Sequence, residues 1–286
     1  MIVVGEHLDG LAVSAPRRVR DALRPTLGPA YRRARRELQW RLARADFRVR
    51  RAPDAACPFL VVQHATPLVR RLAGMDPVLQ HNKVVNLRLA AERLDGLVLL
   101  PGQRLSFWRE VGPPNRRRGF VEGAVLVRGK VHAGVGGGLC QMTNLLYWMT
   151  LHTPLTVVER WRHSYDVFPD AERTQPFGSG ATCAWPSLDL QVENRTGTAW
   201  RLSISLDERS LHGAWCAAMP FEGSFEVYEQ AHVVTHESPG VYVRHNRIAR
   251  REYDADGALV ADELVAENHA LMMYEPFLPA ATPVHD

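Results

Sequence analysis

The stretch GVGGGLCQMTNLLYWM, residues 134–149, constrains the fold most, because it joins a run of glycines directly to an amphipathic helix. Glycine adopts backbone conformations closed to other residues and lets main-chain N–H groups approach a ligand closely. The residues after the run place an apolar stripe at helical spacing. This stripe comprises Met142, Leu145, Leu146 and Met149. The pattern predicts a central helix that packs on one face and begins at a glycine-lined surface.

Cys140 stands in the first turn of this predicted helix, off the apolar stripe and on the side of Thr143, Asn144 and Tyr147. Unpaired N–H groups and the positive end of the helix dipole stabilise a thiolate at that position. A cysteine in a globular protein more often packs than reacts, but the glycines and the polar face favour a reactive thiol.

Spacing predicts a histidine partner for this cysteine. A helix over 140–152 spans about 20 Å, and a strand over 155–162 spans about 26 Å. Antiparallel packing then returns His163 to Cys140, an arrangement typical of thiol acyl transfer, in which the imidazole activates the thiol and protonates the leaving group. His132 is a weaker alternative to His163, and His152 is expected to serve as a partner of the helix C-terminus.

The remaining candidate residues are assigned by their place around this pair. Asp166 and Asp170 are both candidates to orient His163, and the sequence does not choose between them. Main-chain N–H groups around Gly138–Gln141 are expected to hold an oxyanion. The candidate oxyanion and substrate-binding residues are Gly136, Gly137, Gly138, Gln141, Asn144, Arg162 and Ser164.

The four cysteines are far apart and form no CxxC pair, so the sequence predicts four free thiols and no structural zinc or disulfide framework. Cys183 and Cys216 lie in strand-like runs and are expected to belong to the core. No cofactor or metal is expected.

Residues 17–51 carry thirteen arginines against Asp21, Glu37 and Asp46, which localises the positive charge of the chain. After a break at Pro25, Gly28 and Pro29, a helix is expected over 30–50. Its narrow apolar stripe comprises Tyr31, Ala34, Leu38, Leu42, Ala45 and Val49. Such a helix suits an anionic membrane surface or an acidic partner, or else packs one face on the body as a solvated arm. Nucleic acid is not favoured, since no recognised fingerprint is present.

The rest of the chain predicts an α+β fold, mainly antiparallel. A helix is expected between Asp76 and Gly96, with Pro77 at its first position. Strands are expected at 101–108, 119–130, 155–161, 187–194 and 200–206, followed by a hairpin over 247–265 about Asp256-Gly257. The expected units are a basic arm (1–52), a main domain (53–210) and a β-rich extension (211–286). Without an apolar signal or spanning segment, a cytoplasmic protein is expected, peripheral at the inner membrane face.

Five segments over Asn82–Asn194 together resemble the VanW family. They are RLSFWREVGP, RGFVEGAVLVRGK, GGGLCQMTNLLYW, VVERWRHSYDV and LDLQVEN. The chain is similar to the stand-alone members of vancomycin-resistance clusters. The resemblance implies L,D-transpeptidase-like or peptidase-like chemistry on peptidoglycan stem peptides or lipid-linked precursors, with Cys140 as nucleophile and His163 as the motif histidine. One departure is that many members carry Asp where this chain has Gly180.

Two other classes of function compete with a cysteine acyltransferase. A non-catalytic protein would keep the same cleft and bind cell-wall precursors or a partner enzyme. A redox-sensing protein would use the activated thiol, which oxidises readily. Formation of an acyl-enzyme separates the first class from both others.

Overall fold

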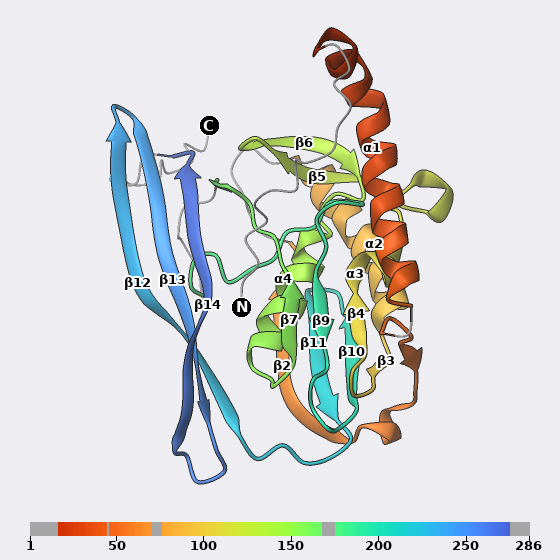
Figure 1. The fold of residues 1–286 in the computed structure, drawn as a ribbon, viewed down its shortest axis with the longest axis vertical. Coiled ribbons are helices and arrows are strands. Elements are labelled where there is room, and N and C mark those ends of the chain that lie inside the picture. Colours follow the sequence, from red (N-terminus) through yellow and green to blue (C-terminus); the bar gives the residue numbers. More distant parts are fainter. Residues whose placement is uncertain (1–16, 45, 70–75, 168–174, 275–286) are drawn as a thin grey trace.

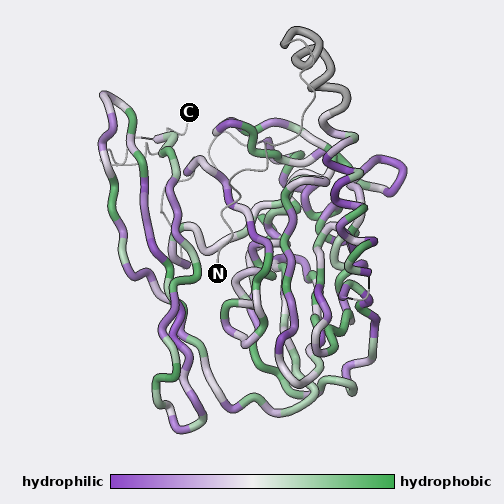
Figure 2. Tube along the Cα trace, in the orientation of Figure 1, coloured by the Kyte–Doolittle hydropathy of each residue, from purple (hydrophilic) through white to green (hydrophobic). Residues whose placement is uncertain are grey.

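The computed structural model describes residues 17–44, 46–69, 76–167 and 175–274, with side chains from residue 28 onward. The fold is α+β and mainly antiparallel, which confirms the predicted class. A compact body lies beside a long three-stranded ribbon, and a helix covers the body's far edge (Figure 1). Polar and apolar stretches are interspersed along the ribbon's strands (Figure 2).

The largest sheet has five strands in the order β1-β3-β10-β11-β2, all antiparallel. Its strands are β1 (Arg50–Arg51), β2 (Phe59–Pro67), β3 (Leu97–Leu99), β10 (Trp200–Leu206) and β11 (Ser210–Ala217). Strand β10 occupies the residues predicted for it. Because β11 pairs with both β2 and β10, the main sheet continues beyond the expected boundary at 210.

Two helices pack on this sheet and form the core with it. Helix α2 (Pro77–Leu94) begins as expected, with the Asp76 side chain accepting a hydrogen bond from Val78 N at 2.8 Å. Helix α4 (Cys140–Leu151) buries the predicted stripe completely. Tyr147, expected on the polar side, is buried as well.

A smaller sheet in the order β4-β9-β7 adjoins α4 and leads toward His163. Its strands are β4 (Arg104–Ser106), β7 (Thr156–Glu159) and β9 (Gln191–Glu193). The strand expected over 101–108 ends at Ser106, because that side chain accepts a hydrogen bond from Arg109 N and starts the short helix α3 (Phe107–Val111). A hairpin of β5 (Glu122–Val127) and β6 (Lys130–Val135) follows. Single 3-10 turns lie at Asp54–Ala56 and Arg116–Arg118.

The third sheet follows the order β12-β13-β14-β8. It contains β8 (Tyr165–Asp166), β12 (Ser224–Ser238), β13 (Val241–Tyr253) and β14 (Leu259–Met272). The expected hairpin is present as β13 and β14, with Gly257 at φ 77° in the turn. Strand β8 pairs parallel to β14, which ties this sheet to the segment just after His163.

The N-terminal helix differs from its prediction at both ends. Helix α1 runs from Arg17 to Leu42 through Pro25 and Pro29, so the expected break is wrong, and the structure offers no reason for this. The helix ends before residue 50 because the chain turns toward the body to bury the Phe47 side chain in the core. Arg36 and Trp40 are also buried, so the helix is docked on the body.

No helix among the described residues is long and apolar enough to cross a membrane.

Candidate cysteine site at the start of α4

The glycine run places Cys140 by allowing close packing around it. Gly136 and Gly138 have φ of 80° and 90°, which disfavour any side chain. A Cβ on Gly137 would lie 2.2 Å from the backbone of Gly123, and one on Gly138 would lie 2.1 Å from the Lys83 side chain. These glycines are therefore required by packing, whatever they also do for a ligand.

The buried Asn86 side chain on α2 also holds the glycine segment in place. Asn86 Nδ2 donates to Gly137 O at 2.9 Å and to Val121 O at 3.0 Å, and Asn86 Oδ1 accepts from Val121 N at 2.9 Å. A fully buried side chain that satisfies three backbone groups fixes their relative position. The turn that delivers Cys140 is thus anchored to α2.

Thr182 joins Cys140 to His163. Its backbone N donates to Trp161 O at 2.8 Å, which pairs the segment carrying Thr182 with the segment that carries His163. The Thr182 hydroxyl lies 3.3 Å from Cys140 Sγ and 3.0 Å from His163 Nε2. The structure thereby brings Cys140 and His163 together as spacing predicted, with a hydroxyl between them.

Cys183 is the second thiol of the site. Its Sγ lies 4.0 Å from Cys140 Sγ and donates to it. This hydrogen bond contributes most to holding the pKa of Cys140 well below its ordinary value, against the opposing effect of burial, and the hydrogen bond and charge of His163 and the Thr182 hydroxyl lower it further. Burial and the neighbouring Cys140 raise the pKa of Cys183 well above its usual range. The pair therefore consists of one acidic thiol and one thiol that keeps its proton.

The N-terminus of α4 is open. No side chain caps it, and within the described residues the N–H groups of Leu139 and Cys140 donate to no backbone acceptor. Gln141 N, by contrast, donates to Gly138 O at 3.1 Å. Open N–H groups beside a thiolate are able to bind the oxygen of a carbonyl under attack.

Among the predicted substrate-binding side chains, Gln141 and Asn144 hold neighbouring segments together, whereas Ser164 is exposed. Gln141 Nε2 donates to Thr66 Oγ1 and Pro67 O, both at 2.9 Å, so this amide fastens α4 to β2. Asn144 Oδ1 accepts from Ala181 N at 2.8 Å and holds the segment that leads to Thr182. Ser164 is exposed and its carbonyl accepts from Leu271 N at 3.0 Å.

The Asn144 side chain fills the space beside Gly180. A Cβ at position 180 would lie 2.4 Å from Asn144 Oδ1, so an aspartate there would require Asn144 to move. The glycine at position 180 therefore leaves room for the Asn144 side chain.

Two arginines approach the site without a carboxylate partner among the described residues. Arg160 donates to Gly178 O and Gly180 O and lies 4.9 Å from the centre of the Tyr147 ring. Arg162 makes one long hydrogen bond, to His163 O at 3.4 Å. Burial, and then the charge of Arg160, lower the pKa of Arg162 to about 10. An anionic group of a ligand would relieve this unbalanced charge.

Asp166, the candidate acid that the structure describes, does not contact His163. Asp166 is buried, ion-paired to Arg244 at 3.4 Å and hydrogen-bonded by Tyr274 Oη at 2.8 Å. Asp170 lies outside the described residues. Within the described chain the partner of the imidazole is the Thr182 hydroxyl, which sequence reasoning missed.

The missed residues carried weak signals. Thr182 lies two residues after Gly180, the position at which the chain departs from many VanW members. Cys183 was expected to belong to the core because it lies in a strand-like run, and it does contact the core while its thiol faces Cys140.

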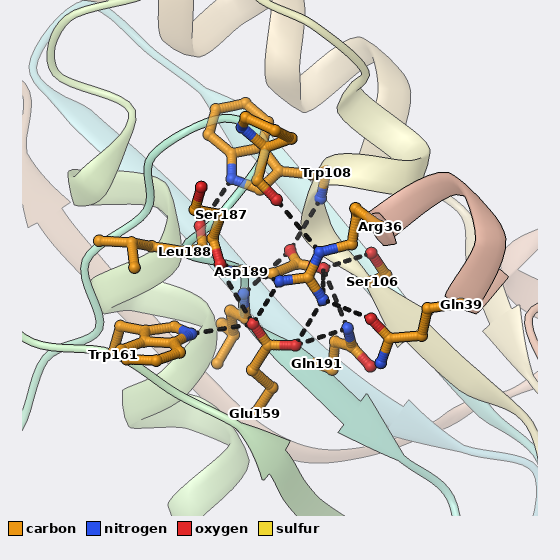
Figure 3. A network of polar contacts seen from close by, with 12 residues as sticks. Arg36, Gln39, Ser106, Trp108, Glu159, Trp161, Ser187, Leu188, Asp189 and Gln191 are labelled. Atoms are coloured by element: carbon orange, nitrogen blue, oxygen red, sulfur yellow. Dashed lines mark hydrogen bonds and ion pairs between the residues drawn. The ribbon is translucent and has the colours of Figure 1, made fainter. Parts of the chain in front are cut away.

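A buried polar network connects helix α1 to the segment 182–189 (Figure 3). Arg36 of α1 donates to both carboxylate oxygens of Glu159 at 2.6 Å, to Pro186 O at 3.1 Å and to Ser187 O at 2.9 Å. Burial raises the pKa of Asp189 to about 6, although Ser106 and the Trp108 backbone donate to its carboxylate. The Arg36 guanidinium thus links helix α1 to Glu159 on β7, the strand before His163, and to the loop after Cys183.

We expect iodoacetamide to alkylate Cys140 first, and at a lower pH than the other cysteines, because only its pKa is lowered among the four thiols. Cys57, Cys183 and Cys216 have pKa values raised chiefly by burial, so they should react only at higher pH or after unfolding. Peptide mapping after labelling across pH measures this order. Equal rates for all four thiols would contradict an activated Cys140.

Comparison with known proteins places the site inside a family region. The family model described as VanW like protein matches residues 82–216, which include Cys140, His163 and Thr182. No solved structure matches this chain.

Two curated relatives align with the chain. The Vancomycin B-type resistance protein VanW of Enterococcus faecalis is 33% identical over 189 residues, which cover 66% of this chain and 69% of the relative. The Uncharacterized protein YoaR of Bacillus subtilis is 31% identical over 110 residues, 38% of this chain and 35% of that protein. Because the first relative is matched at this identity over more than two thirds of its length, the resemblance seen in the sequence is confirmed, and the chain belongs to the VanW family.

Proposed function

We propose that the protein is a cysteine-dependent acyltransferase that acts on peptidoglycan stem peptides or their lipid-linked precursors. The observation that carries the proposal is the Thr182 hydroxyl, which lies within hydrogen-bond reach of both Cys140 Sγ and His163 Nε2. The relative named for vancomycin resistance directs the choice of substrate to the cell wall.

In the proposed reaction the Cys140 thiol passes its proton to the Thr182 oxygen as the Thr182 hydroxyl passes its own proton to His163 Nε2. The thiolate then attacks the peptide carbonyl, and the N–H groups of Leu139 and Cys140 hold the oxyanion. The protonated imidazole gives its proton back to the leaving amine as the C–N bond breaks. The thioester that remains is opened by an acceptor amine or by water.

Position and charge support a peptide substrate. Cys140 is half-buried and His163 is exposed, so the pair lies near the surface of the protein. Arg162 supplies an unbalanced positive charge next to His163, suited to a carboxylate of the stem peptide.

The proposal predicts a covalent adduct on Cys140. Incubation with synthetic stem tetrapeptide and pentapeptide should raise the intact mass by that of the peptide less its released amine. The adduct should be absent in Cys140→Ala and present in Cys216→Ala, a matched removal of a thiol away from the site. If calorimetry detects peptide binding but no adduct forms, the protein is a non-catalytic binding protein, the alternative class given in the sequence analysis.

The proximity of Cys183 favours a second candidate, a thiol redox sensor. Peroxide would take two electrons from the two thiols, leaving a Cys140–Cys183 disulfide and water. The same mass measurement distinguishes it: a loss of about 2 Da on mild oxidation, reversed by a dithiol and absent in Cys183→Ala, supports the sensor, whereas a peptide adduct supports the acyltransferase.

A further inference from the structure

The outward face of α1 carries a narrow apolar stripe. Tyr31, Leu38 and Leu42 are 67%, 55% and 81% exposed. At about 100° per residue these three lie within about 40° of one another on the helix, and Trp40, on the docked side, lies about 180° from Tyr31. The part of the predicted stripe that lies on α1 is thus turned away from the body, whereas Val49, beyond the helix, packs against the core. The helix is held to the body by Arg36 and Trp40 instead.

Positive charge lines this stripe. Arg32 and Arg35 are exposed, and neither makes an ion pair within the described chain. Arg41 approaches Glu37 at 3.9 Å, and that carboxylate also accepts from Arg33 at 2.8 Å. An exposed apolar face bordered by arginines is the arrangement of helices that lie in the interface of an anionic membrane.

A pocket of about 650 Å³ opens where the helix ends. Its lining comprises Trp40, Phe47, Val49, one carboxylate, Glu110, and four arginines, which are Arg44, Arg48, Arg50 and Arg109. Only Arg109 has a carboxylate within reach among the described residues, Glu110 at 4.0 Å. The guanidinium of Arg109 also lies 5.6 Å from the centre of the Phe47 ring.

The charge of the pocket favours an anion. Four guanidinium groups against one carboxylate make it a suitable place for the oxygens of a phosphate.

We propose that α1 docks on an anionic phospholipid surface, with the stripe Tyr31, Leu38 and Leu42 inserted among the lipids and the exposed Arg48 and Arg50 beyond the helix end pairing with headgroup phosphates. This inference is independent of the chemistry proposed for Cys140. An acidic protein would pair with the arginines but would leave the three apolar side chains unexplained. A membrane satisfies both features at once.

The test is co-sedimentation of the full chain with vesicles of phosphatidylcholine alone or mixed with phosphatidylglycerol. Binding should require phosphatidylglycerol and should disappear at about 0.5 M salt, where exposed charges are screened. Arg48→Gln with Arg50→Gln should weaken binding about 25-fold. Leu38→Gln with Leu42→Gln should weaken it by about tenfold or more at unchanged charge. Arg209→Gln with Arg247→Gln, a matched removal of two exposed arginines elsewhere, should weaken it far less.

Three results would overturn the proposal. Equal loss in the pocket variant and in the Arg209 and Arg247 control would reduce the effect to net charge. Full binding by the Leu38 and Leu42 variant would remove the stripe from the interface. Inorganic pyrophosphate that binds as the vesicles do, with vesicle binding insensitive to the stripe, would make the pocket a site for a free phosphate ligand.

Discussion

His163→Ala is expected to lower peptide-dependent turnover by roughly 10² to 10⁴, because the group that accepts and returns the proton is lost. The Cys140 alkylation profile should move to higher pH in the same variant, since both the hydrogen bond and the charge of His163 lower the pKa of that thiol. Thermal unfolding should hardly change, because His163 is exposed. Turnover and iodoacetamide labelling measure the two effects independently.

Thr182→Val tests the hydroxyl between the two residues. It keeps the shape of a buried side chain and removes the atom that lies 3.3 Å from Cys140 Sγ and 3.0 Å from His163 Nε2. We expect it to reproduce most of the kinetic loss of His163→Ala. His132→Ala is the matched control, an exposed histidine on β6 that should leave both readouts unchanged. Unaltered labelling in the His163 variant would refute the assigned pairing.

Arg36→Ala is expected to destabilise the protein by about 3–5 kcal/mol, as the loss of one partner of a buried ion pair does. Glu159 would lose both of its 2.6 Å hydrogen bonds while only 18% of its side chain is exposed, and Asp189 would remain fully buried with a neighbouring carboxylate. Chemical denaturation followed by circular dichroism measures the free energy of unfolding.

Arg33→Ala serves as the control on the same helix. Its ion pair with Glu37 is exposed at an i,i+4 spacing, so its loss should cost about 0.5 kcal/mol or less. Glu159→Gln in the Arg36→Ala background should recover part of the stability by removing an uncompensated charge. Equal effects of the two arginine variants would mean that α1 contributes little to the fold and acts as the separate arm considered from the sequence.

Local patterns determined much of the candidate site. The apolar stripe of residues 142–149 predicts the extent of α4 and one of its packed faces, so the place of Cys140 at the helix N-terminus follows from helical spacing. The 11 residues between Leu151 and His163 suffice for a turn and a returning strand, and β7 supplies that strand. These elements depend on contacts close in sequence, which is why their arrangement was predictable.

Contacts distant in sequence decided the rest. Thr182 and Cys183 join Cys140 across about 40 residues through an isolated bridge to Trp161, and no periodicity signals such a bridge. Likewise, the sequence of α1 shows an apolar stripe without showing which face packs. The buried face is set by Arg36 and Trp40, because Glu159 and Trp185, more than 100 residues away, offer a matching carboxylate and an aromatic ring. Charge and ring complementarity of this kind exists only once the chain has folded, so the tertiary structure alone turned the stripe outward.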